Sequence, residues 1–114
     1  MEMKRGDIVV AIASGDYGKP RPALVVQSDL FNPTHASVVV CPITSHLGDM
    51  PLFRLPISPT PENGIKKESQ LMIDKMMVIK REKIGKRVGR LPPADMQAVD
   101  EALRLWLNLD RDAG

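Results

Sequence analysis

One arginine stands between two prolines in "GKPRPALVVQ" (18–27), directly before an apolar run. Proline fixes its own φ and restricts the residue before it, so the backbone of Arg21 is constrained from both sides. A guanidinium on a stiff stem suits a phosphate or carboxylate ligand, because its planar fork loses little freedom on binding. On position alone, a solvent-facing arginine where a loop enters a sheet is the simpler interpretation.

Two hydroxyls follow a second apolar run, in "SVVVCPITSH" (37–46). Thr44 and Ser45 stand where a buried strand would leave the sheet, a position at which a rigid scaffold can hold binding groups. Such a pair is also common in a simple hydrogen-bonded turn. His35 and His46 are an alternative acid–base pair for phosphodiester cleavage, although the sequence shows no partner that would orient them.

Asp74 lies within "QLMIDKMMVI" (70–79), which we predict to be one strand, although aspartate is disfavoured in strands. It shares a face with methionines, and we expect these apolar neighbours to raise the pKa of its carboxyl, as a general base requires. An outward-facing aspartate that pairs with Lys66 or Lys75 is the structural alternative.

Basic residues cluster in "KREKIGKRVGR" (80–90), which has six Lys or Arg against one Glu. A solvated charged face is the simpler interpretation, and a track along a phosphate backbone is the functional one. The candidate contacts to such a backbone are Lys19, Lys80, Arg81, Lys86 and Arg87.

The 114 residues are 43% apolar and 26% charged with a formal charge of +2, as in globular rather than disordered proteins. We expect one domain over residues 1–114. Without a membrane-length apolar run or a signal-peptide pattern, we expect no membrane partner and a cytoplasmic protein. The single cysteine, Cys41, is expected to be a buried thiol, and with only two histidines we expect no metal site and no cofactor.

Short apolar runs between Gly- and Pro-rich turns predict strands at 7–12, 22–27, 37–43, 52–57, 70–79 and 86–91. Pro56 places one of these strands at a sheet edge. A helical pattern covers 93–109, with Pro92 and Pro93 at its start and Trp106 on its apolar stripe, so we expect Trp106 in the core rather than as a binding aromatic. The predicted fold class is mainly β with a helix (α+β): a small, strongly bent antiparallel sheet or barrel with a C-terminal helix.

Five segments resemble, in this order, the MazF/PemK toxins of bacterial type II toxin–antitoxin systems: "KRGDIV", "RPALVVQ", "PITS", "ESQLMIDKMMVIKREKIG" and "VDEALRLWL". The resemblance covers nearly the whole chain. It implies an SH3-like, CcdB-like twisted β-barrel, usually a homodimer, and a sequence-specific, metal-independent endoribonuclease acting on single-stranded RNA (mRNA). It also implies a cognate antitoxin whose disordered tail covers the RNA-binding groove.

The same resemblance assigns catalytic roles. The family's "RP" arginine falls on Arg21, its hydroxyl pair on Thr44 and Ser45, and its later-strand acid on Asp74. The implied reaction is attack by the RNA's own 2′-hydroxyl, with Asp74 as base and the other three stabilising the phosphorane, to give a 2′,3′-cyclic phosphate and a 5′-hydroxyl. Two features depart from the family: a short first loop, "SGDYGK", and Met72 where some relatives have an arginine proposed as general acid.

Two other functions fit the same fold class. CcdB toxins bind DNA gyrase through the extreme C-terminus, but this chain ends in "NLDRDAG" and lacks their terminal tryptophan motif. The other alternative is an inactive SH3-like binding module, against which the presence of Arg21, Thr44 and Asp74 argues. Met72, Met76 and Met77 form an apolar strip whose ordinary role is to fill the core. The alternative is a self-association face, and together with the resemblance it leads us to expect a homodimer.

Overall fold

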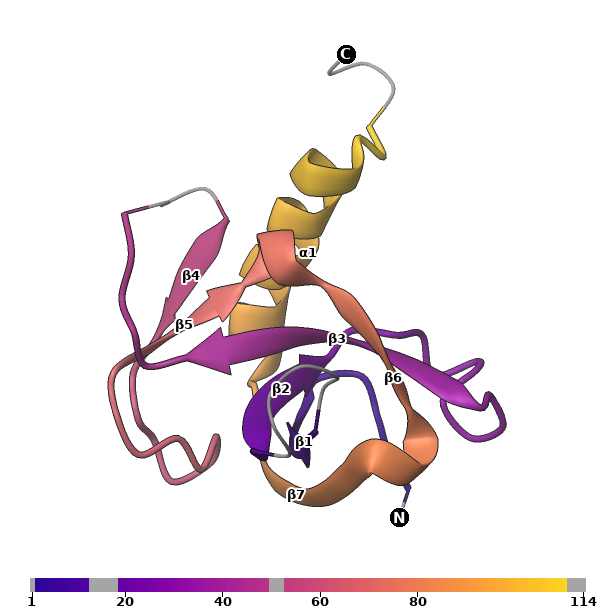
Figure 1. Cartoon of the computed structure of the whole chain (residues 1–114). Coiled ribbons are helices and arrows are strands. Elements are labelled where there is room, and N and C mark those ends of the chain that lie inside the picture. The colour runs from indigo at the N-terminus through magenta and orange to yellow at the C-terminus, as the bar shows by residue number, and fades with distance from the viewer. Residues whose placement is uncertain (1, 13–18, 50–52, 111–114) are drawn as a thin grey trace.

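The computed structural model describes residues 2–12, 19–49 and 53–110, so most of the first loop, residues 13–18, lies outside the described part. The strands are β1 (Asp7–Ala11), β2 (Arg21–Val25), β3 (Ser37–Thr44), β4 (Arg54–Ile57), β5 (Ser69–Met72), β6 (Met77–Lys80) and β7 (Ile84–Arg90) (Figure 1). The helical elements are the 3-10 turns η1 (Ile73–Lys75) and η2 (Arg81–Lys83) and the α-helix α1 (Pro93–Leu107).

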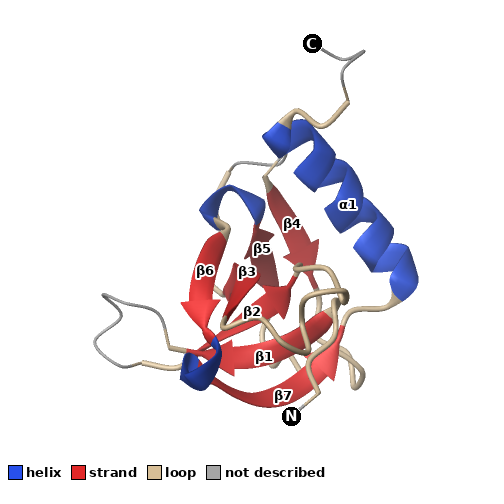
Figure 2. Ribbon diagram, turned by 90° about the vertical axis from the view of Figure 1, so that its right-hand side faces the viewer, coloured by secondary structure: helices blue, strands red, loops and turns tan. Residues whose placement is uncertain are grey.

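The strands form one antiparallel sheet in the order β4-β5-β3-β2-β1-β7, and β6 also pairs with β3. The predicted mainly β fold with a C-terminal helix is confirmed, as is the edge position of β4, which contains Pro56. Over the described residues the sheet twists strongly but does not close (Figure 2), so the barrel form of the prediction is replaced by an open sheet.

The stretch 70–79 is not the single strand that its apolar pattern predicts. It divides into β5 and β6, with η1 between them, because β3 pairs with β6 along Ser37–Val40 and with β5 only at Ile43 and Thr44. The Ile73 side chain is fully buried at the break, and its N–H donates to the Phe53 carbonyl at 2.9 Å. The chain therefore turns where its partner strand changes neighbours.

Apolar side chains of β1, β2 and β3 alternate between two core clusters, one on each face of the sheet. One cluster contains Ile8, Leu24 and Cys41 and receives α1, while the other contains Val9 and Val25. The prediction of a buried Cys41 is confirmed, and desolvation by burial raises the pKa of its thiol to about 12.

Helix α1 begins with Pro92 at the N-cap and Pro93 in its first turn, as the sequence predicted. It ends at Asn108, which has a left-handed backbone (φ 54°). The helix lies along one side of the sheet (Figure 2), and its buried positions are Val99, Ala102 and Leu103. No helix in residues 2–12, 19–49 and 53–110 is long and apolar enough to cross a membrane.

The prediction that Trp106 belongs to the core is wrong. Its residue is 42% exposed, and its ring packs edge-on against Phe53 with the ring centroids 4.7 Å apart. Trp106 lies about one turn beyond the last buried residue of the helix, Leu103. Aromatic packing at the surface takes the place of full burial there.

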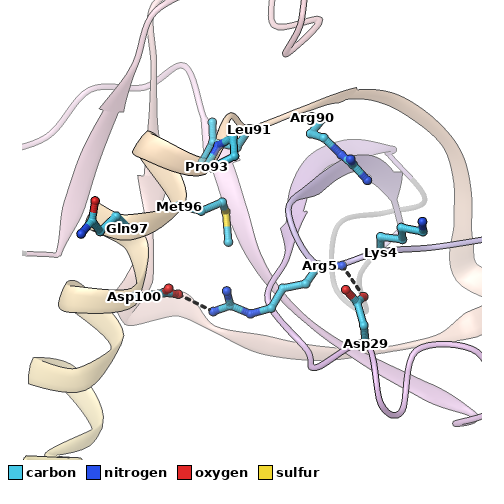
Figure 3. Close-up of a pocket in the computed structure, with 9 residues that line it drawn as sticks. All are labelled: Lys4, Arg5, Asp29, Arg90, Leu91, Pro93, Met96, Gln97 and Asp100. Carbon is cyan, nitrogen blue, oxygen red and sulfur yellow. Dashed lines mark hydrogen bonds and ion pairs between the residues drawn. The ribbon is translucent and has the colours of Figure 1, made fainter.

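Arg5 connects the N-terminal segment to α1. Its backbone N–H donates to Asp29 Oδ1 at 2.7 Å, its Nε to the Val26 carbonyl at 2.8 Å and its Nη2 to Asp100 Oδ1 at 2.7 Å. Arg5, Asp29 and Asp100 border a hollow of about 590 Å³ between the N-terminal segment and α1 (Figure 3). The bond from the Arg5 N–H is the main cause that lowers the pKa of the Asp29 carboxyl. The contacts fix the start of the chain against the helix.

Candidate active site

Arg21 and Thr44 lie at the same end of a pair of neighbouring strands. Arg21 is the first residue of β2 and Thr44 is the last of β3, and the antiparallel register of these strands sets Ala23 opposite Pro42. Two residues further along this register, the exposed Arg21 reaches the level of Thr44. The constrained "PRP" segment thus enters the sheet beside the exit of the β3 hydroxyls.

A hollow of about 350 Å³ opens at this strand end. Its polar lining includes Arg21, Thr44, Ser45, Lys66, Lys67 and Ser69, and its apolar lining includes Pro20, Pro22, Ile43, Ile65 and Val88. The structure therefore brings together three of the four residues predicted to be catalytic. The fourth, Asp74, is not among the residues that line the hollow.

The Thr44 hydroxyl is already oriented by the backbone. Its Oγ1 accepts a hydrogen bond from the N–H of His46 at 3.0 Å, which is the local turn that such a residue pair often forms. Because this bond uses an oxygen lone pair, the hydroxyl hydrogen of Thr44 stays available to donate to a ligand. Turn formation and ligand binding are therefore compatible at Thr44.

The hollow is cationic. Arg21, Lys66 and Lys67 line it, and no carboxylate is found among the described lining residues. The sequence prediction missed the two lysines as site residues. The pair follows Gly64 and Ile65, just beyond the turn at 61–63, but exposed lysines in a loop show no periodicity that distinguishes a site from a solvated surface.

Asp74 does not lie on the apolar strand face that the sequence predicted for it. Asp74 lies in η1 rather than in mid-strand, and Arg54 donates to it from Nε (2.9 Å to Oδ1) and from Nη2 (3.2 Å to Oδ2). This hydrogen-bonded guanidinium lowers the pKa of the Asp74 carboxyl, so the expected rise is wrong. The partner is neither Lys66 nor Lys75, because the β4–β5 pairing sets Arg54 opposite Met72.

Arg81 was predicted to contact a phosphate backbone, but its guanidinium is engaged within the protein. Nε donates to the His35 carbonyl at 2.9 Å and Nη2 donates to the Asn32 carbonyl. The side chain therefore holds the loop that precedes β3. The prediction of an RNA contact at Arg81 is corrected, because the guanidinium that was expected to bind phosphate instead stabilises a loop of the protein.

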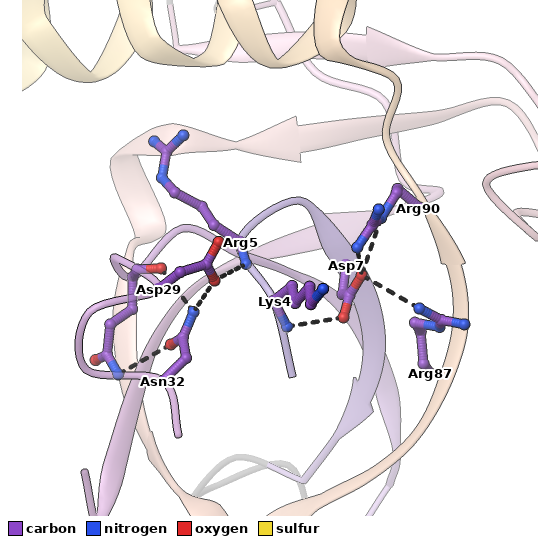
Figure 4. Close-up of polar contacts among 8 residues, drawn as sticks. Lys4, Arg5, Asp7, Asp29, Asn32, Arg87 and Arg90 are labelled. Atoms are coloured by element: carbon purple, nitrogen blue, oxygen red, sulfur yellow. Dashed lines mark hydrogen bonds and ion pairs between the residues drawn. The ribbon is translucent and has the colours of Figure 1, made fainter. Parts of the chain in front are cut away.

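Arg87 is also held by a protein group (Figure 4). The carboxylate of Asp7 is 1% exposed, and its Oδ1 lies 3.7 Å from Arg87 Nη1 and 3.1 Å from Arg90 Nη2, while the backbone N–H of Lys4 donates to its Oδ2 at 2.9 Å. A buried carboxylate needs such partners, since an uncompensated charge is costly in the interior. The Arg87 side chain is 52% exposed, so its predicted contact with RNA stays a prediction, in competition with the Asp7 carboxylate.

The remaining predicted RNA contacts, Lys19, Lys80 and Lys86, are exposed but do not line the hollow. His35 precedes β3 and His46 follows it, so an eight-residue strand separates them. The alternative of a two-histidine acid–base pair is therefore not supported.

A small, open, twisted sheet with an arginine and two hydroxyls at one strand end is suited to bind a phosphodiester. Residues 4–107 match the family described as PemK-like, MazF-like toxin of type II toxin-antitoxin system. The chain belongs to this family. The match favours the toxin resemblance over the gyrase-binding and inactive alternatives.

Relatives and solved structures agree with this assignment. The chain is 48% identical over 108 residues to a probable endoribonuclease MazF of Mycolicibacterium smegmatis, covering 94% of this chain and 98% of the relative. It is 26% identical over 113 residues to endoribonuclease EndoA of Bacillus subtilis, covering 96% and 97%. The Mycobacterium tuberculosis toxin MazF-mt6 has a similar structure, with a TM-score of 0.79 at 25% identity over 91% of this chain and 98% of that one.

The fold also recurs in a mycobacterial endoribonuclease solved in complex with its cognate antitoxin. The TM-score is 0.79 at 21% identity, over 94% of this chain and 96% of that one.

Proposed function

We propose that this toxin is an endoribonuclease that cuts single-stranded RNA, mRNA included, in the hollow at the start of β2 and the end of β3. The observation that carries the proposal is the meeting of Arg21 with Thr44 and Ser45 in a hollow whose described lining contains cations and no carboxylate. The family and the relatives named as endoribonucleases support the same activity.

The proposed chemistry is an internal transesterification. The 2′-oxygen of the RNA forms a bond to the adjacent phosphorus, the bond from phosphorus to the 5′-oxygen breaks, and the 2′-proton ends on the departing 5′-oxygen. The products are a 2′,3′-cyclic phosphate and a 5′-hydroxyl. Arg21 and the hydroxyls of Thr44 and Ser45 donate hydrogen bonds to the phosphorane, and one such donor contributes about 3 kcal/mol to the barrier reduction.

Asp74 has no role as base in this scheme. Its carboxylate accepts two hydrogen bonds from Arg54, and it does not line the hollow that holds Arg21. Its lowered pKa also makes it a weaker base at neutral pH than an ordinary aspartate. We propose that it acts as a structural group instead.

Single-stranded RNA is the substrate class because base readout in RNA needs unstacked nucleotides, which a duplex does not offer. We propose that this readout makes cleavage sequence-specific and that the exposed Lys19, Lys80 and Lys86 contribute outer contacts to the RNA. No step of the scheme uses a metal ion. An enzyme that acts on mRNA would work in the cytoplasm.

We propose two protein partners, a cognate antitoxin and a second copy of the chain. A mycobacterial endoribonuclease of the same fold, solved with its cognate antitoxin, supports the first. For the second, Met72, Met76 and Met77 are partly exposed, and Val78 beside them is 66% exposed. Sedimentation at micromolar concentration should give twice the 12.6 kDa chain mass, and a pure monomer would contradict the dimer.

The test of the activity is incubation with a long single-stranded RNA in excess EDTA. We expect cleavage at defined sites, 2′,3′-cyclic phosphate ends, and no cleavage of the same sequence annealed to its complement. A synthetic RNA with one 2′-deoxy nucleotide at the mapped site should bind but stay intact. Loss of cleavage on chelation would contradict the metal-free scheme, and cleavage of the deoxy substrate would identify water as the nucleophile.

A further inference from the structure

The connection between β4 and β5, residues 58–68, is held by the side chain of one buried asparagine. Asn63 accepts hydrogen bonds at Oδ1 from the N–H groups of Thr60 (3.1 Å) and Ile65 (2.9 Å), and its Nδ2 donates to the Ser58 carbonyl at 2.9 Å. The hydroxyl of Ser58 also donates to Glu68 Oε2 at 2.9 Å, which joins the two ends of the connection. These bonds give the 58–68 loop a defined internal shape.

Two glycines dock this loop onto β7. Gly64 has φ +69°, and a Cβ there would lie 2.1 Å from the Val88 carbonyl oxygen. A Cβ on Gly89 would lie 2.2 Å from the carbonyl of Asn63. The backbone N–H of Arg90 also donates to the Glu62 carbonyl at 2.9 Å. Because the backbones of the loop and of β7 are in close contact at both glycines, only glycine allows the loop to pack on the strand in this way.

The docked loop sets two lysines at the hollow. Lys66 and Lys67 are exposed and line it with Arg21, and the hydroxyl of Ser69 donates to the Lys67 carbonyl at 2.7 Å. Within the described residues, no ion pair engages either ammonium, in contrast to Arg54 and Arg87. The two lysines therefore add positive charges that no ion pair within the described residues neutralises.

We propose that Lys66 and Lys67 form a cationic rim that binds RNA phosphates flanking the one that Arg21 and Thr44 hold. This inference rests on the proposed ribonuclease function and adds a role that the sequence prediction placed on the basic run 80–90. A lysine suits this position because flanking phosphates need a mobile point charge rather than a fixed fork. The rim determines how strongly RNA is held and how that affinity depends on salt.

The test compares two double variants of equal charge. Lys66→Gln/Lys67→Gln removes the rim, and Lys75→Gln/Lys83→Gln removes two exposed lysines that do not line the hollow. The probe is a single-stranded oligonucleotide of 2′-O-methyl ribonucleotides, which has no free 2′-hydroxyl and needs no mapped cleavage site, and its affinity is measured over a series of KCl concentrations. Counterion release predicts that the log–log slope becomes shallower by roughly 0.7 for each phosphate that the variant no longer neutralises.

We expect the slope of the rim variant to be shallower by roughly 1.4 and the control variant to keep the wild-type slope and cutting rate. Equal slopes for the rim variant and the wild type would overturn the rim, even if the wild type cuts RNA. Equally shallow slopes in both variants would overturn it as well, since the effect would then be one of net charge. If the wild type does not cut RNA yet the rim variant alone has a shallower slope, the proposed activity fails and the rim stands. A thermal unfolding curve for each variant excludes misfolding as the cause.

Discussion

The guanidinium of Arg54 donates two hydrogen bonds to the carboxylate of Asp74, from Nε at 2.9 Å and from Nη2 at 3.2 Å. The two side chains are only 14% and 11% exposed. The pair joins edge strand β4 to the η1 turn, at the break between β5 and β6. An acid that the sequence suggested as a catalytic base is therefore part of the structure that keeps β5 and β6 apart.

We predict that Asp74→Asn lowers stability at neutral pH by roughly 1.5–3 kcal/mol, the contribution of hydrogen bonds to a charged group. The pKa of Asp74 is lower in the folded protein than the ordinary value of 3.8. Its contribution is therefore present above pH 3.8 and is lost as the pH falls through the folded-state pKa. Urea unfolding at about pH 7 and about pH 3 should show a variant–wild-type difference that shrinks in acid.

The pH profile of cleavage distinguishes this role from catalysis. If Asp74 is structural, the folded Asp74→Asn enzyme keeps the wild-type profile at neutral pH. If it were the general base, the variant would lose the limb of the profile that belongs to that base. The double change Arg54→Met/Asp74→Leu is the control, because replacing both partners leaves no unpaired buried charge.

Arg21→Ala should reduce the cutting rate by at least about a hundredfold, as expected for the loss of one donor to the transition state. Arg21→Lys should also be poor, because a point charge does not reproduce the two-pronged guanidinium. Single-turnover cleavage at saturating RNA measures both, with Lys83→Ala as the exposed control expected to cut normally. A near-normal rate for Arg21→Ala would remove Arg21 from the mechanism.

Arg81→Ala should affect folding before it affects RNA. The side chain donates to the carbonyls of His35 and Asn32, so its removal leaves two acceptors in the loop before β3 without their charged donor. We expect a loss of roughly 1.5–3 kcal/mol in urea unfolding. RNA affinity of the folded variant should keep the wild-type salt dependence. A shallower salt slope without loss of stability would restore Arg81 to the RNA contacts.

Cys41 should resist alkylation by iodoacetamide at about pH 8 in the folded protein and react after denaturation. Burial raises the pKa of its thiol to about 12, so the reactive thiolate is scarce. The folded-state pKa of Cys41 lies above the ordinary value of 9.0, so the folded protein holds the thiol proton more tightly than the unfolded chain does. The stability that comes from burying the neutral thiol is therefore complete below pH 9.0 and is lost as the pH rises toward 12. Mass spectrometry of the labelled protein measures the outcome, and rapid labelling of native protein would contradict the burial.

The sequence predicted well what depends on strand pairing between neighbours. The runs that contain Arg21 and Thr44 are consecutive strands, and consecutive antiparallel strands bring the start of one beside the end of the other. Their meeting therefore follows from order along the chain. The helix start also followed from local chemistry, because proline prefers the first helical turn.

The remainder depended on contacts between distant residues. The break at Ile73 arises because β3 changes partner along its length, and no local signal records this. The partner of Asp74 is set by the β4–β5 register, because this pairing brings Arg54 close to Asp74 although the two residues are twenty positions apart in the chain. The ion pair of Arg87 exists because Asp7 is buried and its carboxylate needs cationic partners. Periodicity alone does not identify such a buried carboxylate.

The alternation of β1, β2 and β3 between two core clusters has a consequence for how this toxin can change over evolutionary time. Backbone amides in these doubly covered strands should exchange most slowly with solvent, so the global stability lies there. The 58–68 loop is held in place separately, by the hydrogen bonds of Asn63 and by the close packing of Gly64 and Gly89. The exposed Lys66 and Lys67 can therefore be replaced without repacking Leu24 or Val25, and a new RNA preference can arise by drift at the rim while the same core is inherited.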